Sequence, residues 1–297
     1  MPNLLAAICT AATAFVGTIC TPGTPGTHAA VLVLGGSGGG DGLAPFATRF
    51  AQRGYVAASV AYFGAPGLPD ALDEIPVETV EKALAAVAQR PDVDPSRIGL
   101  FGDSKGGELA LLAASTYPQF RAVVAVVPSP FAWSGASLGS SWTVGGKPVP
   151  YVQLERRPRG GPFRGFGNGT PVESRRAYDA SMRLHRSAIP AATFHLENVR
   201  GPILLLAGDD DGVWDSPAQC AIGIAYLHAR AHPYADEYVH YPNAGHAFLF
   251  ATPARPLVEG ARGTLTVRFG GTPAGNVAAH DAAWTKIDDF LTRALGA

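Results

Sequence analysis

The 297-residue sequence predicts a single α/β domain whose mostly parallel sheet is covered by helices on both faces. Short apolar runs typical of buried strands alternate with longer segments of helical periodicity along most of the chain. Three of the apolar runs end in glycine-rich loops, at 35–42, 102–107 and 208–212. Because ligands bind at the carboxyl ends of parallel strands, these loops are the expected position of a site.

The expected elements alternate in chain order. We expect strands at 15–20, 30–35, 55–62, 97–101, 121–127, 202–207 and 236–241. We expect helices at 43–53, 76–90, 105–116, 174–187, 215–231 and 279–294. The helix at 76–90 shows the reasoning, because Pro76 is a favoured first helical residue and an apolar stripe comes after it, comprising Val80, Ala83, Leu84 and Val87.

Two stretches interrupt the alternation within the domain 1–297. Residues 129–172 form a lid-like insertion rich in glycine, proline and aromatic residues, and 251–275 form a second, smaller one. The first is either a solvated surface excursion or a lid whose aromatics, Trp142 and Tyr151 among them, line an acyl pocket. Its basic cluster would then meet phosphate groups of the substrate, and it consists of Arg156, Arg157, Arg159 and Arg164.

Composition limits the classes of partner. A net charge of −1 and the lack of a basic helix argue against nucleic acid. Three unpatterned cysteines predict no disulfide framework, so a reduced, cytoplasmic protein is expected. The apolar run at 4–20 is shorter than the ~20 residues that span a bilayer. Its last part, 15–20, is interpreted as an early strand, and the alternative is a short signal peptide that ends near Ala14 and exports the protein.

The most specific motif is Gly102-Asp103-Ser104-Lys105-Gly106, between an apolar run and a helical segment. A G-x-S-x-G string in this position predicts a nucleophile elbow, a strained strand-to-helix turn that exposes the serine hydroxyl. Gly102 and Gly106 are expected because a Cβ there would collide with a neighbouring strand or helix. Ser104 is therefore the candidate nucleophile.

A nucleophilic serine needs a base and an acid, which this fold supplies in the chain order Ser, Asp, His. The run 203–207 is closed by Gly208 and followed by three consecutive aspartates, which compete for the role of the acid. In hydrolases with such an elbow the acid commonly lies three residues after the closing glycine, which selects Asp211. Asp209 and Asp210 are interpreted as loop or turn residues. His246 comes after the expected strand 236–241 and a Pro-Asn-Ala-Gly turn, which makes it the candidate base.

The other histidines fit less well. His240 lies within an expected strand, and His280 opens the last expected helix. His228 and His232 are four residues apart in an expected helix, but the glutamate of H-E-x-x-H and a third ligand are missing. A surface helix face is favoured for that pair, and neither a metal nor another cofactor is predicted.

Donors for an oxyanion are expected from two places. One is the backbone N–H of Lys105 at the start of the helix. The second is an N–H of the loop after the run 30–34, from among Gly36, Ser37 and Gly38. A phosphate cradle or dinucleotide turn is disfavoured there because the loop lacks G-K-[S/T] and satisfies G-x-G-x-x-G in no frame.

Several segments together resemble a known family, the C-terminal domain shared by acyl-CoA thioesterases and bile-acid-CoA:amino-acid N-acyltransferases. The resemblance runs from about residue 15 to the C-terminus, and the strings that carry it are 35–40, 102–110, Trp142-Thr143 with 146–148, 200–204, 209–216 and 241–246. It implies an α/β-hydrolase fold similar to that of dienelactone hydrolases, with the nucleophile at Ser104, the acid at Asp211 and the base at His246.

The resemblance also bears on the reaction. The family's amino-acid transferases place cysteine at the elbow and its thioesterases serine, so Ser104 implies hydrolysis. Animal members carry a β-sandwich domain of roughly a hundred residues ahead of the hydrolase, whereas about thirty residues precede the first expected core strand here. Substrate features of that domain are therefore not carried over.

The sequence predicts a serine hydrolase that cleaves an acyl thioester, carried by coenzyme A or by an acyl carrier protein, through an acyl-serine intermediate. The alternatives are a carboxylesterase similar to dienelactone hydrolase that acts on oxygen esters, and an acyltransferase to an amine or alcohol. A binding protein with the same fold but no activity is disfavoured by the presence of all three candidate residues.

Overall fold

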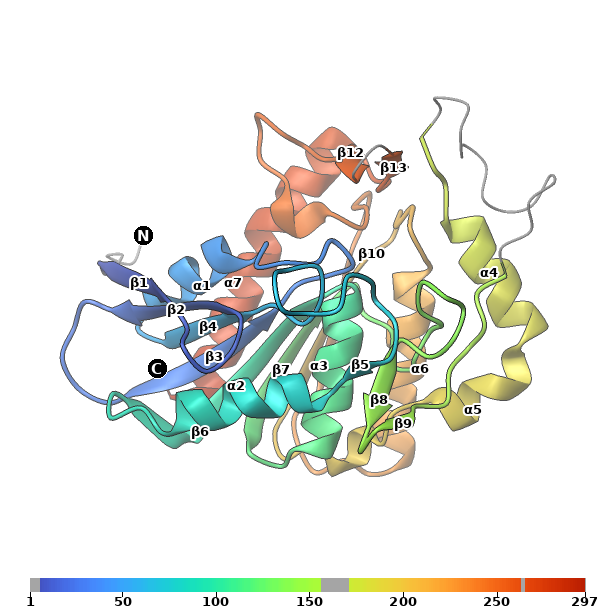
Figure 1. Ribbon diagram of the computed structural model, residues 1–297. Coiled ribbons are helices and arrows are strands. Elements are labelled where there is room, and N and C mark those ends of the chain that lie inside the picture. Colours follow the sequence, from blue (N-terminus) through green and yellow to red (C-terminus); the bar gives the residue numbers. More distant parts are fainter. Residues whose placement is uncertain (1–5, 156–170, 263–264, 297) are drawn as a thin grey trace.

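The computed structural model describes residues 6–155, 171–262 and 265–296 (Figure 1). Its centre is an eight-stranded sheet of order β1-β2-β4-β3-β6-β7-β10-β11. The strands are β1 (Ala7–Ala11), β2 (Gly17–Pro22), β3 (His28–Leu34), β4 (Val56–Val60), β6 (Val93–Asp103), β7 (Phe120–Val126), β10 (Ile203–Gly208) and β11 (Glu237–Tyr241). All neighbours from β4 to β11 pair in parallel, and β2 is antiparallel to both of its neighbours. The expected mostly parallel sheet is confirmed.

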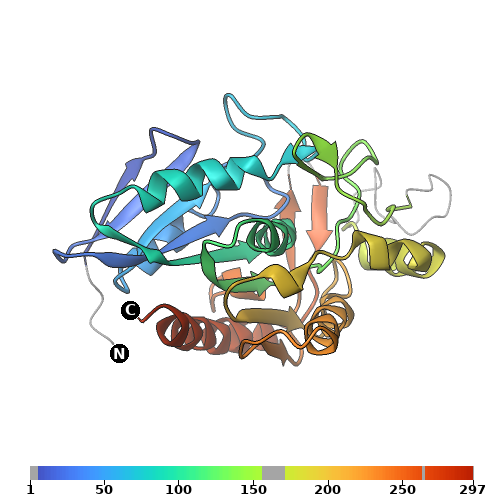
Figure 2. The ribbon, with the colours of Figure 1, turned by 90° about the horizontal axis from the view of Figure 1, so that it is seen from below.

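Helices cover both faces of this sheet, as Figures 1 and 2 show from two directions. On one face lie α2 (Glu78–Ala88), α3 (Lys105–Thr116) and α6 (Ser216–Ala229), and on the other α1 (Ala44–Ala51) and α7 (Pro273–Leu295). The residues of β3 divide alternately between two hydrophobic clusters, Leu32 and Leu34 facing the first set of helices and Val31 and Val33 the second. Both faces of a central parallel strand are buried, which explains its continuous apolar sequence.

The smaller elements lie outside this frame. A three-stranded sheet joins β5 (Ile75–Pro76), β8 (Trp142–Val144) and β9 (Lys147–Pro148), and a hairpin joins β12 (Glu259–Arg262) to β13 (Leu265–Arg268). The short helices are α4 (Arg175–Leu184), η1 (Arg186–Ala188), α5 (Ile189–Ala192), η2 (Leu196–Asn198) and η3 (Phe248–Phe250). The two expected insertions therefore contain regular structure of their own.

Two expected helix starts are wrong. Pro76 ends the short strand β5 rather than opening a helix, because its neighbour Ile75 pairs with Trp142 of β8, and α2 begins at Glu78. The last helix begins at Pro273, six residues earlier than expected, because the Thr272 hydroxyl accepts a hydrogen bond from the Gly275 N–H at 3.0 Å and caps it.

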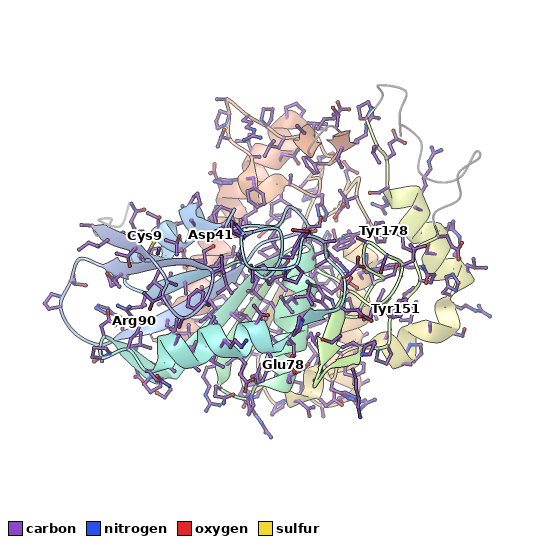
Figure 3. All side chains as sticks on the ribbon, in the orientation of Figure 1. Cys9, Asp41, Glu78, Arg90, Tyr151 and Tyr178 are labelled. Atoms are coloured by element: carbon purple, nitrogen blue, oxygen red, sulfur yellow. A yellow bond between two sulfur atoms is a disulfide. The ribbon has the colours of Figure 1, made fainter. Side chains whose placement is uncertain are left out.

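The expectation of unpaired cysteines is also wrong. Cys9 of β1 and Cys20 of β2 stand directly opposite each other in the antiparallel pair and form a disulfide, while Cys220 is free and buried. β1 itself is not among the expected strands, and it lies at the edge of the sheet, where Figure 3 labels Cys9. Within the described ranges, no helix is long and apolar enough to cross a membrane.

The described part of the first insertion is packed rather than loose. Phe131 and Trp133 are fully buried in a third hydrophobic cluster that also contains Trp214 and Ala177. A solvated excursion therefore does not describe residues 129–155, because their largest side chains form core. We call residues 131–142 the aromatic wall.

Candidate active site

Ser104 occupies the sharp turn between β6 and α3, with φ 55° and ψ −119°. Such a backbone conformation is strained for a residue with a side chain, and it persists only where the surroundings hold it. A Cβ on Gly102 would lie 2.1 Å from the Gly106 carbonyl oxygen, and one on Gly106 would lie 2.2 Å from the Leu34 carbonyl oxygen. Both glycines are therefore required by close backbone approach, as the motif predicted.

The three candidate residues meet in one hydrogen-bonded chain. His246 Nε2 lies 2.8 Å from Ser104 Oγ, and His246 Nδ1 lies 2.8 Å from Asp211 Oδ2. The other oxygen of Asp211 accepts hydrogen bonds from the backbone N–H groups of Val213 and Trp214. All three side chains are buried or nearly so, and the imidazole can therefore accept a proton from Ser104 while Asp211 holds its other nitrogen.

The loops that carry Asp211 and His246 are held by a segment far along the chain. His246 N–H donates to the Phe269 carbonyl at 2.7 Å, and Gly212 N–H donates to the same oxygen at 2.9 Å. Asp211 and Gly270 form an antiparallel bridge. Residues 269–271 thus lie between the acid loop and the base loop, which gives the second insertion a structural task beside the site.

Asn276, on the first turns of α7, completes this support. Its Oδ1 accepts from Gly245 N–H at 2.7 Å, and its Nδ2 donates to the carbonyls of Pro256 and Gly270 at 2.9 and 3.2 Å. The side chain is fully buried. Sequence reasoning missed Asn276, and the only signal was a polar residue on an otherwise apolar stripe of the last helix.

Two neighbouring aspartates have other partners. Asp209 bonds the exposed ring of His240 at 2.8 Å, and Asp215 caps α6 by accepting from Ala218 N–H and pairs with Arg175 at 2.7 Å. The choice of Asp211 over Asp209 agrees with this geometry.

The histidine pair at 228 and 232 does not form a helix face. α6 ends at Ala229, and His232 lies beyond it with a buried ring held between Asp236 at 2.6 Å and the Val199 carbonyl at 3.0 Å. The expected i, i+4 surface pair is therefore wrong. Among the residues that the structure describes, no group of three or more histidine, cysteine, aspartate or glutamate residues could hold a metal ion.

The loop after β3 runs beside the elbow. A Cβ on Gly36 would lie 3.1 Å from Ser104 Cβ, and one on Gly38 would meet nothing within 4 Å. The Tyr62 hydroxyl donates to the Gly35 carbonyl and steadies the start of the loop. Gly36 is thus close to the candidate nucleophile, with Ser37 and Gly38 next to it in the loop, and Lys105 follows Ser104 as the first residue of α3.

Three buried side chains at or next to the elbow, those of Asp103, Lys105 and Glu108, did not enter the sequence interpretation. Asp103 is 7% exposed, its Oδ1 has no hydrogen-bond partner among the described residues, and burial raises its pKa to about 7. Lys105 Nζ forms an ion pair with both oxygens of Glu108, at 2.8 and 2.9 Å. Burial lowers the pKa of Lys105 and raises that of Glu108, and the opposite charge of the partner resists both shifts. The string 102–108 contains these residues, but nothing in the sequence indicates that their side chains are buried.

The residues expected to contact substrate differ in burial, and some of them lie outside the described residues. Trp142 is fully buried, and its Nε1 donates to Glu108 at 2.6 Å, so its expected place on the surface of an acyl pocket is corrected to one within the core. Tyr151 is partly buried and lies, like Tyr178, on the side of the molecule away from Cys9 (Figure 3). Arg156, Arg157, Arg159 and Arg164 lie outside the described residues.

Known proteins resemble the chain over most of its length. Human acyl-coenzyme A thioesterase 1 is 27% identical over 285 residues, which cover 94% of this chain and 63% of the human protein. Rat acyl-coenzyme A thioesterase 2, mitochondrial, is 28% identical, with 94% of this chain and 58% of the rat protein covered. The chain therefore spans less than two thirds of the length of these curated relatives.

Solved structures share the fold at lower identity. A putative dienelactone hydrolase from Klebsiella pneumoniae superposes with a TM-score of 0.58 at 17% identity, covering 97% of this chain and 99% of the other. An esterase from Pyrobaculum calidifontis gives 0.55 at 20%, covering 93% and 80%. These likenesses show an α/β-hydrolase fold.

A family model matches residues 75–297, which include the elbow, the acid loop and the base loop and make up more than half of the chain. Its description is BAAT / Acyl-CoA thioester hydrolase C terminal. The protein belongs to this family.

Proposed function

We propose that the protein is a serine hydrolase that cleaves an acyl thioester. The observation that carries this proposal is the continuous hydrogen-bonded chain from Ser104 through His246 to Asp211, with Ser104 in the strained turn of an elbow. Membership of a thioester hydrolase family and the thioesterase names of the relatives support the choice of substrate class.

The proposed reaction has two steps, acylation of the serine and hydrolysis of the acyl-serine. His246 Nε2 takes the proton of Ser104 Oγ as this oxygen attacks the acyl carbonyl carbon, and Asp211 stabilises the imidazolium. His246 then gives the proton to the departing sulfur, and an acyl-serine remains. Water, deprotonated by the same imidazole, attacks the acyl-serine and releases the free acid and the serine hydroxyl.

The carbonyl oxygen becomes negatively charged in both steps, and main-chain donors would hold it. The N–H of Lys105 begins α3, where the helix dipole favours negative charge. A second donor would come from Gly36, Ser37 or Gly38, since this loop approaches the Ser104 side chain closely. The mechanism requires no metal or other cofactor.

The first test is covalent labelling with a fluorophosphonate, followed by turnover assays on an acyl-CoA, an acyl carrier protein and p-nitrophenyl esters. We expect labelling of the wild type but not of Ser104→Ala, whose kcat should fall by about a thousandfold or more. Turnover of p-nitrophenyl butyrate without turnover of any thioester would favour the esterase alternative, and an unlabelled wild type would contradict the proposal altogether.

The same assay separates hydrolysis from transfer. With an acyl-CoA and excess glycine or taurine, we expect free acid, because the oxygen ester of an acyl-serine is less open to amines than a thioester would be. Amide as the main product would make the protein an acyltransferase.

We also propose that Arg156 and Arg157 bind the phosphate groups of the substrate and that Tyr151 lines the acyl pocket. Arginine binds phosphate through a planar pair of donors, and a charged contact weakens with salt. Arg156→Ala combined with Arg157→Ala should raise KM for an acyl-CoA and leave kcat and the hydrolysis of p-nitrophenyl butyrate nearly unchanged. An equal loss on the neutral ester would show that the arginines only support the structure.

A further inference from the structure

The Lys105–Glu108 ion pair is a buried charge pair that adjoins the nucleophile, and the proposed mechanism does not use either side chain. The Lys105 side chain is 6% exposed and that of Glu108 is 0% exposed. A pair this deep is costly to desolvate and offers little net stability over apolar residues of similar size. Its place next to the nucleophile therefore calls for another explanation.

Glu108 is the point at which the nucleophile helix meets the aromatic wall. Its Oε1 accepts from the Trp133 N–H at 3.0 Å and the Trp142 Nε1–H at 2.6 Å, in addition to Lys105 Nζ at 2.8 Å. Trp133 lies near the start of the wall and Trp142 at its end, 25 and 34 residues beyond Glu108. One carboxylate thus joins α3 to both ends of a segment that is distant in the chain.

The same wall reaches the base through ring contacts. The Trp133 ring lies edge-on to Tyr178 at 4.7 Å, Tyr178 lies edge-on to Trp214 at 5.3 Å, and Trp214 lies edge-on to the His246 imidazole at 5.4 Å. The contacts form a closed circuit that starts at Ser104, passes through His246 and this row of rings, and returns through Glu108 and Lys105.

We infer that Glu108 is a positioning residue that fixes the Lys105 peptide, the proposed oxyanion donor, relative to the base. The lysine side chain bonds Glu108, three residues further along the same helix. The residue whose N–H would face the oxyanion is therefore held twice, through its main chain by the helix and through its side chain by the ion pair. A donor displaced by about 1 Å can lower a rate about a hundredfold. The inference rests on the proposed function of Ser104, but not on the thioester as substrate.

The test measures the binding of an alkyl trifluoromethyl ketone as well as turnover. Ser104 Oγ adds to the ketone carbon, its proton passes to His246 Nε2, and the carbonyl oxygen becomes a tetrahedral oxyanion. Affinity for this ketone depends on the same donors as the reaction, whereas a defect confined to stability leaves the affinity of the folded protein unchanged.

We expect Glu108→Gln and Lys105→Met each to lower kcat by about tenfold to a hundredfold with little change in KM. The Ki of the ketone should rise by the same factor. Each variant leaves one buried charge without its partner, so each also lowers the melting temperature. The double variant removes both charges, and we expect it to regain most of the stability while the rate and Ki stay impaired.

A matched control comes from another well-buried pair, His232–Asp236, whose acidic member bonds Ile203 N–H at the opposite end of β10. Asp236→Asn should lower the melting temperature and leave kcat and Ki within about twofold of the wild type. A double variant with wild-type kcat and Ki would overturn the inference and leave the pair a structural feature only. A wild type that binds no ketone and accepts no fluorophosphonate would instead overturn the proposed function.

Discussion

The elbow at Ser104 and the two loops that carry Asp211 and His246 are built in opposite ways. The elbow is encoded by two glycines within five residues, because Gly102 lets β6 pass close to the first turn of α3 and Gly106 lets α3 pass close to the end of β3. The acid and base loops are held by residues 269–276, which come after them along the chain and bond to both. A local motif is visible in a sequence, whereas a support supplied from a distance is not.

The largest expected effect comes from the acid. Asp211→Asn should lower kcat by about a thousandfold, because an amide in that place no longer fixes the imidazole tautomer or stabilises its charge. Asp215→Asn is the matched control, since asparagine caps a helix as well as aspartate does. Steady-state kinetics of both variants decide the matter: a dead Asp215→Asn beside an active Asp211→Asn would move the acid to Asp215.

The next effect breaks the elbow. Gly106→Ala places a methyl group against the Leu34 and Gly35 carbonyl oxygens, so we expect a loss of about 3 kcal/mol or more in the free energy of unfolding. Gly139→Ala has room for its methyl group and should change this free energy by less than about 0.5 kcal/mol. Urea denaturation measures both, and equal stabilities would show that the turn tolerates a side chain.

A third prediction concerns the support of the base loop by Asn276. Asn276→Ala removes three hydrogen bonds and leaves the buried Gly245 N–H without its partner, which should cost about 2 to 3 kcal/mol of stability. Because the same loop carries His246, kcat should also fall, by about tenfold. Thr285→Ala, on an exposed part of α7, should leave both quantities unchanged. A stable Asn276→Ala with full activity would mean that the Phe269 carbonyl holds the base loop alone.

The smallest effect concerns pH. The pKa of Asp103 is about 7 in the folded protein and 3.8 as its ordinary value, so the folded state binds the proton more tightly. This group therefore favours folding at low pH, and its contribution is lost as pH rises from about 4 to 7 and beyond. Between about pH 5.5 and about pH 7.5 the loss amounts to about 2 kcal/mol.

Asp103→Asn should abolish that part of the pH dependence, which urea denaturation at these two pH values would show. On going from the lower to the higher pH, the Asn variant should lose about 2 kcal/mol less stability than the wild type. If the Asn variant loses as much stability between the two pH values as the wild type does, Asp103 is charged in the folded protein throughout this range. The elbow would then tolerate a buried carboxylate.

Much of the frame is predictable because its signals are local. The buried strand β3 is apolar throughout since both of its faces are covered, and the glycines of the elbow indicate a close approach of two backbones. The start of α7 lies six residues before the expected one because its cap, Thr272, resembles an ordinary loop residue until the Gly275 N–H is seen to bond it. The strand β1 escapes prediction because its mostly exposed residues show no apolar alternation.

The aromatic wall shows where prediction from residue types fails. In the sequence, Trp142 is a large amphipathic side chain in a segment without helix or strand periodicity, a pattern equally consistent with a pocket surface and with core. The structure buries its indole in the core rather than at a pocket, because Glu108, in the first turn of α3, accepts its Nε1–H. Nothing in the string Ser-Lys-Gly-Gly-Glu indicates that this carboxylate is buried.

The sequence by itself determined the layered α/β architecture, the elbow and the identity of the three residues that meet there. Their signals are periodicity, glycine at places of backbone contact, and polar residues directly after buried strands. The tertiary structure alone decided that Cys9 faces Cys20, that Asn276 holds the base loop, and that Lys105 and Glu108 pair beneath the aromatic wall. The first two contacts join residues that are apart in the chain, and the burial of the third pair depends on a segment 25 to 34 residues beyond Glu108. Local pattern carries no record of such distances.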